Sequence, residues 1–568
     1  MHQFETHEVF NQAPPFGDVN LFLADPALQQ ALEREGAGWA RDELAALGER
    51  LGRSEVLDLA RLANANGPRL VNFDRSGRRV DEVEFHPAWH ALMALMIGEG
   101  AHSKPWVAPR PGAQVARAAA YLLFGQVENG AQCPVTMTYA AVPALRRAGA
   151  LGARWLPKIL SSEYDPRSLP VAQKRGALIG MGMTEKQGGT DVRANTTRAV
   201  RIDPAAARAR FGDEGEGAWE LVGHKWFFSA PQSDAHLVLA QAVEAGGDGR
   251  VGRVGDPGAL SCFFVPRFLP DGSRNAIRVQ RLKDKLGNRS NASSEVEFCG
   301  AAGWLVGDVG RGIPTILEMG GYTRLDCVVG TAGIMRAALC HALHHARGRA
   351  AFGKPLAEQP LMQNVLADLA LESEAASAFA LRLARCFDHP DDPAQSLLGR
   401  ILTPAGKYWL CKRGPAFGAE AMEVMGGNGY VEDGPLARLY REFPVNSIWE
   451  GSGNVMCLDV LRALGKDPEA ARAVLEAELG PAAALDPRFA RYVDLLGREL
   501  AGTGEAGARR LAERLVIAVQ GALLLRHAPP FVAEAFLASR IAEDVGGAFG
   551  RLPPGIDAAA ILARALPV

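Results

Sequence analysis

Glu450 is the residue of this sequence that is best suited to take a proton from carbon. It lies between Trp449 and Gly451 and follows the apolar Ile448. Burial in such surroundings raises the pKa of a carboxylate, and the base for a carbon acid needs a raised pKa because an ordinary surface glutamate is too weak. A second interpretation stays open, in which Glu450 caps a helix that begins near Asn454.

Motifs for other chemistries are weak in this sequence. The stretch that begins at Gly180 and Gly182 approaches a dinucleotide-binding G-x-G-x-x-G loop, but Glu185 stands where the third glycine belongs. The sequence holds neither a Walker A motif nor H-E-x-x-H. We interpret two groups of histidines at helical spacing as ordinary helix residues rather than metal ligands: His341, His344 and His345, and His86 and His90. We therefore expect no metal.

The composition indicates a well-packed protein that is able to bury a cofactor. The 568 residues are 48% hydrophobic and 22% charged, with 62 Lys+Arg against 64 Asp+Glu. Because the charge is balanced, any binding of nucleic acid must come from a local patch. The eight cysteines form no C-x-x-C, which is typical of reduced thiols. With neither a signal peptide nor an apolar run of membrane-spanning length, we expect a cytoplasmic protein without a membrane partner.

Three regions with different sequence patterns form the elements that must position these residues. The first 180 residues have mainly helical periodicity. From Met181 onward, short segments rich in Val, Ile and Phe predict an antiparallel β domain, with strands near 219–228, 236–241, 261–266, 277–283 and 294–298, and a flexible glycine-rich hairpin at 244–259. After Gly310, four long helical periods predict a bundle, at 316–349, 359–387, 397–425 and 455–464. Residues 466–568 are interpreted as an additional helical block.

Five short motifs follow one another along the chain. They are Met181-Gly-Met-Thr-Glu-Lys-Gln-Gly-Gly-Thr-Asp191, Lys225-Trp-Phe-Phe-Ser229, Arg349-Ala-Ala-Phe-Gly353, Met425-Gly-Gly-Asn-Gly-Tyr430 and Ile448-Trp-Glu-Gly-Ser452. In this order they resemble the acyl-CoA dehydrogenase superfamily. FETHEVFNQ near the start, LKDKLGNRSNAS and PVNSIWEGSGNVMCLDVLR further resemble its alkylation-response, AidB-like branch. The likeness covers nearly the whole chain and is weakest in the glycine-rich hairpin and in 466–568.

The resemblance implies a multidomain α+β fold and an FAD cofactor. The expected domains are an N-terminal α-helical domain (1–180), a middle antiparallel β-barrel domain (181–305), a C-terminal four-helix bundle (306–464) and an extra helical domain that is a candidate for DNA binding (465–568). It also implies a homotetramer, a dimer of dimers, because Arg349 and the pair Gly426-Gly427 are expected to reach one FAD pyrophosphate from different subunits. Glu423, where relatives usually have Gln, lacks a donor towards the dinucleotide and would alter the hold on it.

The catalytic pair implied by the resemblance is Glu450 as base, with Arg324 as the positive group beside it. Some relatives carry the base at the position of Thr323, which has no basic group, so dehydrogenation here must rely on Glu450. Arg324 could instead form a salt bridge with Asp326 or with another helix.

The resemblance further assigns residues to the cofactor and the substrate. The cofactor-binding set is Met181, Met183, Thr184, Thr190, Phe227, Phe228, Ser229, Arg349, Phe352, Gln359, Gly426, Gly427, Ile448, Trp449 and Gly451, and the substrate-binding set is Thr184, Thr190, Ser229 and Asn454. In this assignment hydroxyls recognise the flavin edge, and Phe227 supplies an aromatic platform for the ring. Thr184 and Thr190 could instead cap turns of a β loop.

Two functions follow from the resemblance and stay open. In the first, the protein is an FAD-dependent flavoprotein of the response to DNA alkylation damage that binds double-stranded DNA and weakly dehydrogenates isovaleryl-CoA. In the second, it is an ordinary acyl-CoA dehydrogenase for a short or branched acyl-CoA, with a C-terminal extension used only for assembly. A third, weaker possibility is a purely structural flavin.

The DNA function requires a positive surface. Residues 466–568 hold 12 Lys+Arg against 13 Asp+Glu, so only local clustering of arginines could bind phosphates. The candidates are Arg462, Arg498, Arg509, Arg510, Arg514 and Arg540. The alternative is a solvated helix face with ion pairs such as Glu505 to Arg509.

Overall fold

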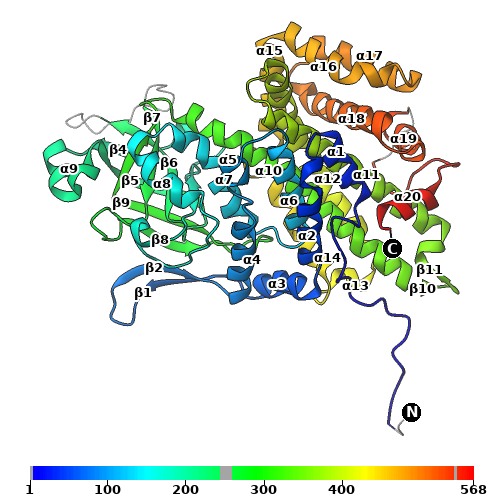
Figure 1. The fold of residues 1–568 in the computed structure, drawn as a ribbon, viewed down its shortest axis with the longest axis horizontal. Coiled ribbons are helices and arrows are strands. Elements are labelled where there is room, and N and C mark those ends of the chain that lie inside the picture. Colours follow the sequence, from blue (N-terminus) through cyan, green and yellow to red (C-terminus); the bar gives the residue numbers. More distant parts are fainter. Residues whose placement is uncertain (1–3, 244–258, 543–546, 568) are drawn as a thin grey trace. The chain divides into compact units, whose positions relative to one another are not determined.

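The computed structural model describes residues 4–243, 259–542 and 547–567, which fold into two compact units (Figure 1). The barrel unit comprises Asp58–Arg110 and Glu128–Asp326, and the helical unit comprises Met1–Leu57, Pro111–Val127 and Cys327–Val568. The expected glycine-rich hairpin lies outside the described residues, except for Ala259. The four domain ranges expected from the sequence stay a prediction.

Five strands close into a ring in the barrel unit. They are β4 (Arg198–Arg201), β5 (Ala218–Ser229), β9 (Ser293–Val306), β7 (Leu260–Pro266) and β6 (Ala235–Val243). Neighbours along this order pair antiparallel, and the parallel pairing of β6 with β4 completes the ring. Two further strands join it, β3 (Ile179–Gly182) on β6 and β8 (Ile277–Leu282) on β9. The expected middle β-barrel is confirmed.

Aromatic and β-branched side chains fill the barrel. Phe228, Phe263, Phe298 and Val296 form one buried cluster, because alternate residues of each strand face the interior. The helices of this unit are α4 (Pro87–Gly98), α5 (Lys104–Val107), α7 (Gln132–Arg146), α8 (Gly149–Ile159) and α9 (Pro204–Phe211), together with most of α3 (Ser54–Ala65) and the first half of α10 (Gly312–Gly348). The start of the chain is therefore helical, as expected.

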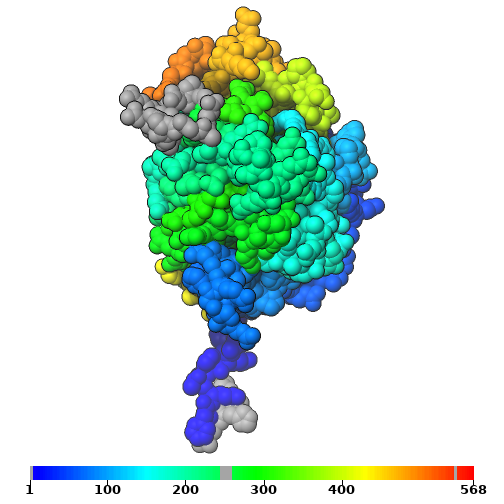
Figure 2. All heavy atoms as spheres, turned by 90° about the vertical axis from the view of Figure 1, so that its left-hand side faces the viewer, coloured from blue at the N-terminus to red at the C-terminus, as the bar shows by residue number. Residues whose placement is uncertain are grey.

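A hairpin in the barrel unit interrupts the helices that we expected over the first 180 residues. It consists of β1 (Arg69–Phe73) and β2 (Arg79–Glu84). It is joined to β8 because Asn72 Nδ2 and Arg79 Nη2 both donate to the carbonyl of Val279, each at 2.8 Å. Figure 2 shows this hairpin, in blue, projecting below the green surface of the barrel strands.

Long helices build the core of the helical unit. They are α11 (Pro360–Asp388), α12 (Pro393–Val424), α14 (Pro435–Asn446), α15 (Gly453–Lys466) and the second half of α10 (Gly312–Gly348). Proline at the first helical position begins α11, α12 and α14, where its missing N–H has no cost. Asp392 caps α12 by accepting from the amides of Ala394 and Gln395. The predicted bundle is confirmed, with α14 as an element that we did not expect.

The remaining helices pack around this core. Those from the N-terminal region are α1 (Pro26–Arg34), α2 (Arg41–Leu51) and α6 (Ala113–Gly125). Those after the bundle are α16 (Pro468–Ala483), α17 (Pro487–Gly502), α18 (Ala508–His527), α19 (Pro530–Phe536) and α20 (Ala558–Ala565), while the short α13 (Gly427–Tyr430) follows α12. Helix α18 packs on α11, α12 and α15. The additional helical block is thus part of the same compact unit as the bundle.

Two features bear on the expected environment of the protein. Among the described helices, α10 is long and apolar enough to cross a membrane, but 89% of its most apolar stretch is buried inside the protein, as in the core helix of a folded domain. All eight cysteines are free thiols, and seven of them are buried, whereas Cys299 of β9 is exposed.

Candidate active site

The loop that follows β3 is anchored by a fully buried ion pair. Lys225 Nζ of β5 lies 2.7 Å from Glu185 Oε1, and neither side chain is exposed. The amides of Thr196 and Thr197 also donate to the Glu185 carboxylate. Burial alone would raise the pKa of Glu185, but the charge of Lys225 and these hydrogen bonds lower it to about 2. Glu185 is therefore a charged anchor within the barrel unit.

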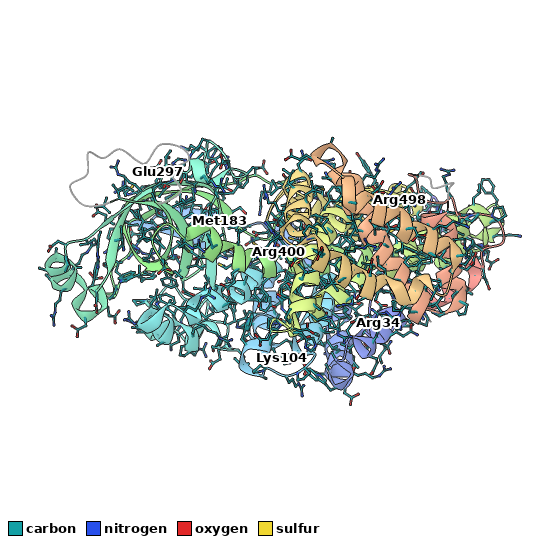
Figure 3. The ribbon with its side chains drawn as sticks, turned by 90° about the horizontal axis from the view of Figure 1, so that it is seen from above. Arg34, Lys104, Met183, Glu297, Arg400 and Arg498 are labelled. Carbon is teal, nitrogen blue, oxygen red and sulfur yellow. The ribbon has the colours of Figure 1, made fainter. Side chains whose placement is uncertain are left out.

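This anchor fixes two predicted cofactor residues, Met183 and Thr184. The carbonyl of Met183 accepts from Asn195 Nδ2 at 2.9 Å and from Lys225 Nζ at 3.4 Å. The carbonyl of Thr184 accepts from the amide of Trp226 at 2.8 Å. Both side chains are half-buried, whereas the predicted ligand residue Thr190 is exposed and Met181 is buried in β3. Figure 3 labels Met183 in this unit.

Neither threonine fulfils the alternative role of turn cap that we considered. The short helical turn after the loop, Val192–Ala194, is capped by the side chain of Asp191, which accepts from the amide of Arg193. Gly189 approaches Thr184 so closely that a Cβ at this position would lie 2.6 Å from the Thr184 hydroxyl. The absence of a side chain at Gly189 therefore leaves room for the Thr184 hydroxyl.

Strand β5 carries two aromatic residues of the predicted cofactor-binding set, and one of them, Phe227, faces the exterior of the barrel. Phe227 is 50% exposed and has the Lys283 ammonium 4.8 Å from its ring centre. Ser229 lies two residues further and is 3.2 Å from Ser293, oxygen to oxygen. Phe228 is fully buried in the barrel core, and its place in the cofactor-binding set stays a prediction. A register shift between Lys225 and Phe228 interrupts the regular alternation of inward- and outward-facing side chains along this strand.

In the helical unit, Arg349 follows α10 and precedes a two-strand hairpin, β10 (Ala350–Ala351) and β11 (Lys354–Pro355). Its Nη1 donates to the backbone carbonyl of Asn11 at 2.6 Å. The Asn11 side chain also pairs with both backbone groups of Ala350, at 2.7 and 2.9 Å. The N-terminal segment thereby holds the base of the Arg349 hairpin. Asn11 belongs to the FETHEVFNQ motif, but the motif did not predict this contact.

Residues that we predicted to bind the cofactor lie at the tip of this hairpin and at the start of α13. Phe352 is fully exposed with a positive φ of 52°, and Gln359 at the start of α11 donates to the carbonyl of Ala351 at 2.9 Å. Gly426 has a φ of 60°, and a Cβ on Gly426 or Gly427 would meet no atom within 4 Å. Because no side chain covers these two positions, the backbone there can be approached closely by a ligand such as a phosphate, although the Gly426 amide already donates to the carbonyl of Glu423 at 2.9 Å.

Glu450 lies in the loop that joins α14 to α15. It is half-buried, less than the fully buried carboxylate that we expected, and has a positive φ of 56°. Such a backbone is strained for a residue with a side chain and often occurs at functional sites. Ser452 occupies the N-cap position of α15 without a side-chain hydrogen bond to the helix, so the capping role considered for Glu450 stays a prediction. Of the neighbouring predicted residues, Ile448 is 65% exposed, and Gly451 has a φ of 107°.

Asn454, predicted to bind substrate, is in contact with a residue predicted to bind DNA. Arg509 Nε of α18 donates to Asn454 Oδ1 at 2.9 Å, and the same guanidinium lies 5.8 Å from the ring centre of Tyr408 on α12. Both interactions lie within the helical unit. They connect the C-terminal helices to the first turn of α15, four residues after Glu450.

Arg324, the other predicted catalytic residue, lies in the barrel unit on the first half of α10 and is half-buried. Its neighbour Thr323 is buried, with its hydroxyl donating to the carbonyl of Gly320. Asp326, the alternative partner of Arg324, accepts a hydrogen bond from Thr136 of α7. The structure thus divides the predicted site residues between the two units.

The six arginines predicted to bind DNA differ in how far they are exposed and in whether they pair with carboxylates of the protein. Arg462, Arg498, Arg509 and Arg510 are exposed, although Arg509 is bonded to Asn454 and Arg510 lies 3.2 Å from Glu499. Arg514 also pairs with Glu499. Arg540 is the exception, because its side chain is only 14% exposed and pairs with Asp368 and Glu372. We therefore remove Arg540 from the candidate phosphate contacts, since releasing it would leave two buried carboxylates without this partner.

Comparison with known families covers most of the chain. Residues 11–166 match the adaptive response protein AidB N-terminal domain, 180–300 the acyl-CoA dehydrogenase middle domain, and 310–465 the acyl-CoA dehydrogenase C-terminal domain. AidB of Escherichia coli K12 is 51% identical over 538 residues, which is 94% of each chain. The chain belongs to the AidB branch of the acyl-CoA dehydrogenase family. This AidB-type chain is thus an FAD-dependent oxidoreductase of the acyl-CoA dehydrogenase type.

Solved structures agree with this AidB-type assignment. The structure of Caenorhabditis elegans ACDH-11 in complex with C11-CoA has a TM-score of 0.82 and 27% identity, with 94% of this chain and 93% of that chain covered. The structure described as Bd2924 apo-form has a TM-score of 0.81 and 30% identity, with 92% and 100% covered. The similarity therefore extends beyond the bundle into the C-terminal helices.

The residues present in this AidB-type chain fit an FAD cofactor. A dinucleotide needs a cation and close backbone approach for its pyrophosphate, which Arg349 and the uncovered pair Gly426-Gly427 offer. The isoalloxazine needs an aromatic surface and hydroxyls, which Phe227, Thr184 and Ser229 offer. Among the described residues, the buried Trp449 Nε1 lacks a hydrogen-bond partner, and such a donor is suited to a bound ligand.

Proposed function

We propose that this protein catalyses the α,β-dehydrogenation of a branched short-chain acyl-CoA such as isovaleryl-CoA, weakly, with Glu450 as the base. The observation that carries this proposal is the strained, half-buried Glu450 in the loop between α14 and α15. A strained residue of this kind persists only where the surrounding structure holds it. Family membership supplies the reaction type, and the residue chemistry supplies the base.

In this proposal the Glu450 carboxylate takes the α-proton of the thioester and becomes a carboxylic acid. The β-hydrogen leaves with its electron pair as the Cα–Cβ double bond forms, so the product is the enoyl thioester. Bound FAD supplies the two-electron acceptor for that hydride. The family resemblance assigns the hydroxyls of Thr184 and Ser229 to the orientation of the reacting groups, and Arg324 to positive charge beside the thioester, and we propose these roles here.

The test is an anaerobic titration of the FAD-loaded protein with acyl-CoA thioesters that differ in length and branching. With isovaleryl-CoA we expect the flavin absorbance near 450 nm to fall by about the whole height of the flavin band. Glu450→Gln should abolish this bleaching, whereas the matched control Glu476→Gln, on the exposed face of α16, should not. Bleaching that survives in Glu450→Gln would exclude Glu450 as the base, and no bleaching with any thioester would favour a structural flavin.

A second function, binding of double-stranded DNA in the response to alkylation damage, is supported by the exposure of three arginines. Arg462 on α15, Arg498 on α17 and Arg510 on α18 belong to one unit, and Figure 3 labels Arg498. Their planar guanidinium groups suit phosphate oxygens. The balanced charge of the block limits such binding to this local set, so we propose contacts to the phosphate backbone rather than to bases.

Duplex binding at several salt concentrations tests this second function. Changing Arg462, Arg498 and Arg510 together to alanine should weaken binding and reduce the slope of log affinity against log salt by about 1 for each phosphate that the protein no longer neutralises. Arg472→Ala is the matched control, because Arg472 is an exposed arginine of α16 that pairs with Glu476. If the unaltered protein has no affinity for duplex, the alternative of an ordinary dehydrogenase with an extension used for assembly is favoured.

We also propose a cytoplasmic homotetramer built as a dimer of dimers. Exposed apolar side chains of the helical unit support a contact with a second copy, among them Phe352, Leu361 and Tyr430, because such side chains often mark an interface. The eight free thiols are compatible with a reducing compartment. Light scattering of the purified protein should give four times the chain mass, and Phe352→Asp should lower it. Localisation in intact cells would test the compartment.

A further inference from the structure

Lys407 is a buried lysine that bonds the loop on both sides of Glu450. It lies on α12, in the helical unit, and is 1% exposed. Its ammonium donates to the carbonyl of Trp449 at 2.6 Å and to the carbonyl of Gly451. In the described part of the chain, these two backbone oxygens are its hydrogen-bond partners, and no carboxylate forms an ion pair with it.

The cost of burying this charge indicates that its position matters. An ammonium removed from water loses several kcal/mol of solvation unless it is well hydrogen-bonded. The other two most deeply buried lysines, Lys225 and Lys174, both have a carboxylate partner, Glu185 and Asp234. Lys407 instead directs its charge at two carbonyl dipoles that follow the end of α14.

The two carbonyls fix the backbone that carries Glu450. The Trp449 carbonyl belongs to the peptide plane that precedes the Glu450 Cα, and the Gly451 carbonyl belongs to the plane after Gly451. Both residues between these planes have a positive φ, 56° at Glu450 and 107° at Gly451. A non-glycine residue in this region is strained by about 1–3 kcal/mol and needs outside contacts to hold it. Lys407 supplies two such contacts.

We propose that Lys407 is a positioning residue for the base, holding Glu450 in its left-handed conformation so that the carboxylate is directed at the α-hydrogen of the thioester. This inference rests on the proposed role of Glu450. The sequence contains a signal for it, since Lys407 is the single charge in the otherwise uncharged stretch of α12 from Ile401 to Leu410. A misplacement of a catalytic group by about 1 Å can lower the rate about 100-fold.

The test compares Lys407→Met, which keeps an unbranched apolar side chain of similar length, with Arg400→Gln. Arg400 is the matched control because it also joins α12 to α15, through Asp459 at 2.6 Å, but contacts the helix rather than the Glu450 loop. We expect kcat with isovaleryl-CoA to fall about 100-fold in Lys407→Met, with KM and FAD content unchanged. Arg400→Gln should keep the kcat of the unaltered protein.

A second readout is independent of turnover. In a 3-thiaacyl-CoA, sulfur replaces the β-carbon, so the thioester can lose its α-proton but has no β-hydride to give. Its deprotonation by the unaltered protein should produce a long-wavelength absorption band beside the oxidised flavin, and this band should be lost in Lys407→Met although the thioester still binds. A crystal structure of the variant should show residues 449–452 displaced. If the variant is too unstable to purify, Lys407→Gln, which retains an amide donor, should show a smaller loss of the same kind.

The outcomes separate this inference from the proposed function. If Glu450→Gln is inactive while Lys407→Met keeps full kcat and the absorption band, the positioning role is overturned and the base stays in place. If Glu450→Gln is active, both proposals fail. If kcat falls only in proportion to lost FAD or to a lowered unfolding temperature, Lys407 has a structural role alone, and the inference is overturned.

Discussion

Arg509 and Asn454 are hydrogen-bonded, with the guanidinium Nε 2.9 Å from the side-chain oxygen. This contact lies on the first turn of α15 and joins a predicted DNA contact to a predicted substrate contact. The guanidinium also lies over Tyr408. In the structure, Arg509 therefore supports the region next to Glu450, and its removal should affect catalysis more than DNA binding.

Replacing Arg509 by alanine should raise the KM for acyl-CoA several-fold, because Asn454 and the start of α15 lose a partner whose hydrogen bond contributes about 1.5–3 kcal/mol. The salt dependence of duplex binding should stay unchanged. Arg498→Ala should do the reverse, with an unaltered KM and a salt slope smaller by about 1. Steady-state kinetics and duplex titrations of both variants measure this. An Arg509→Ala protein with unchanged KM and a reduced salt slope would restore Arg509 to the DNA surface.

Replacing Arg540 by methionine should destabilise the protein by about 3–5 kcal/mol, because Asp368 and Glu372 remain buried without this partner. Arg498→Met, at an exposed position, should change the free energy of unfolding by less than about 0.5 kcal/mol. Urea unfolding monitored by tryptophan fluorescence gives both values. At temperatures where it is folded, Arg540→Met should bind duplex normally, and a loss of duplex binding without a loss of stability would contradict this assignment.

Replacing Lys225 by methionine should release the loop of Met183 and Thr184 and lower the FAD content. The expected destabilisation is about 3–5 kcal/mol, since Glu185 loses its buried counter-charge. Lys174→Met is the control, because it breaks the buried Lys174–Asp234 pair of the same unit without a contact to that loop. The control should also be destabilised, but should keep FAD when folded. The flavin-to-protein absorbance ratio measures the difference, and equal FAD loss in both variants would refute a specific role for Lys225.

Acid should destabilise the protein through two buried carboxylates. The pKa of Glu185 and that of Glu372 are each lowered to about 2, where burial is outweighed by Lys225 for the first and by Arg413 and Arg540 for the second. Because the folded pKa is below the unfolded value, this stabilisation is complete above about pH 5 and is lost as the pH falls towards 2, by about 3 kcal/mol per group. Urea midpoints between pH 6 and pH 3 test this. Glu372→Gln should flatten the dependence, and an unchanged slope would contradict it.

The contact between Asn11 and the Arg349 hairpin should matter for the cofactor. Asn11→Ala removes both hydrogen bonds to Ala350 and disfavours the φ of 55° at this position. We expect a several-fold weaker hold on FAD, measured by flavin release on dilution, because Arg349 is less well ordered. Asn11→Gly tolerates the positive φ but also lacks the side chain, so it should lose less FAD. Equal retention of FAD by all three proteins would count against this role.

The sequence predicted those features that depend on local pattern. The periods of α10, α11, α12 and α15, and the strands β5 to β9, follow from spacing and residue type within each segment. The motifs likewise indicated Glu450 and Arg349. Helix α14 was missed, because its twelve residues include prolines at both ends, Pro435 and Pro444, which are typical of a loop.

The sequence did not predict features that depend on distant partners or on strand register. Arg540 pairs with Asp368 and Glu372, which precede it by more than 160 residues. The residue type and its neighbours in the sequence therefore suggested an exposed cation. The sequence did not indicate that Phe228 points into the barrel core, because the register shift after Lys225 changes which residues point inwards. Lys407 and Asn11 are visible in the sequence, as the single charge of residues 401–410 and within FETHEVFNQ, but the backbone carbonyls and amides that they contact leave no pattern of residue types.

The distribution of thiols makes the barrel unit open to selective chemical labelling. Cys299 is the exposed one among the eight cysteines, so a maleimide dye should attach at one place on each folded chain, on strand β9. A fluorophore there would report on that unit without any engineered cysteine. Resonance energy transfer from this dye to a second label on the helical unit would then measure the separation of the two units in solution, with and without ligands.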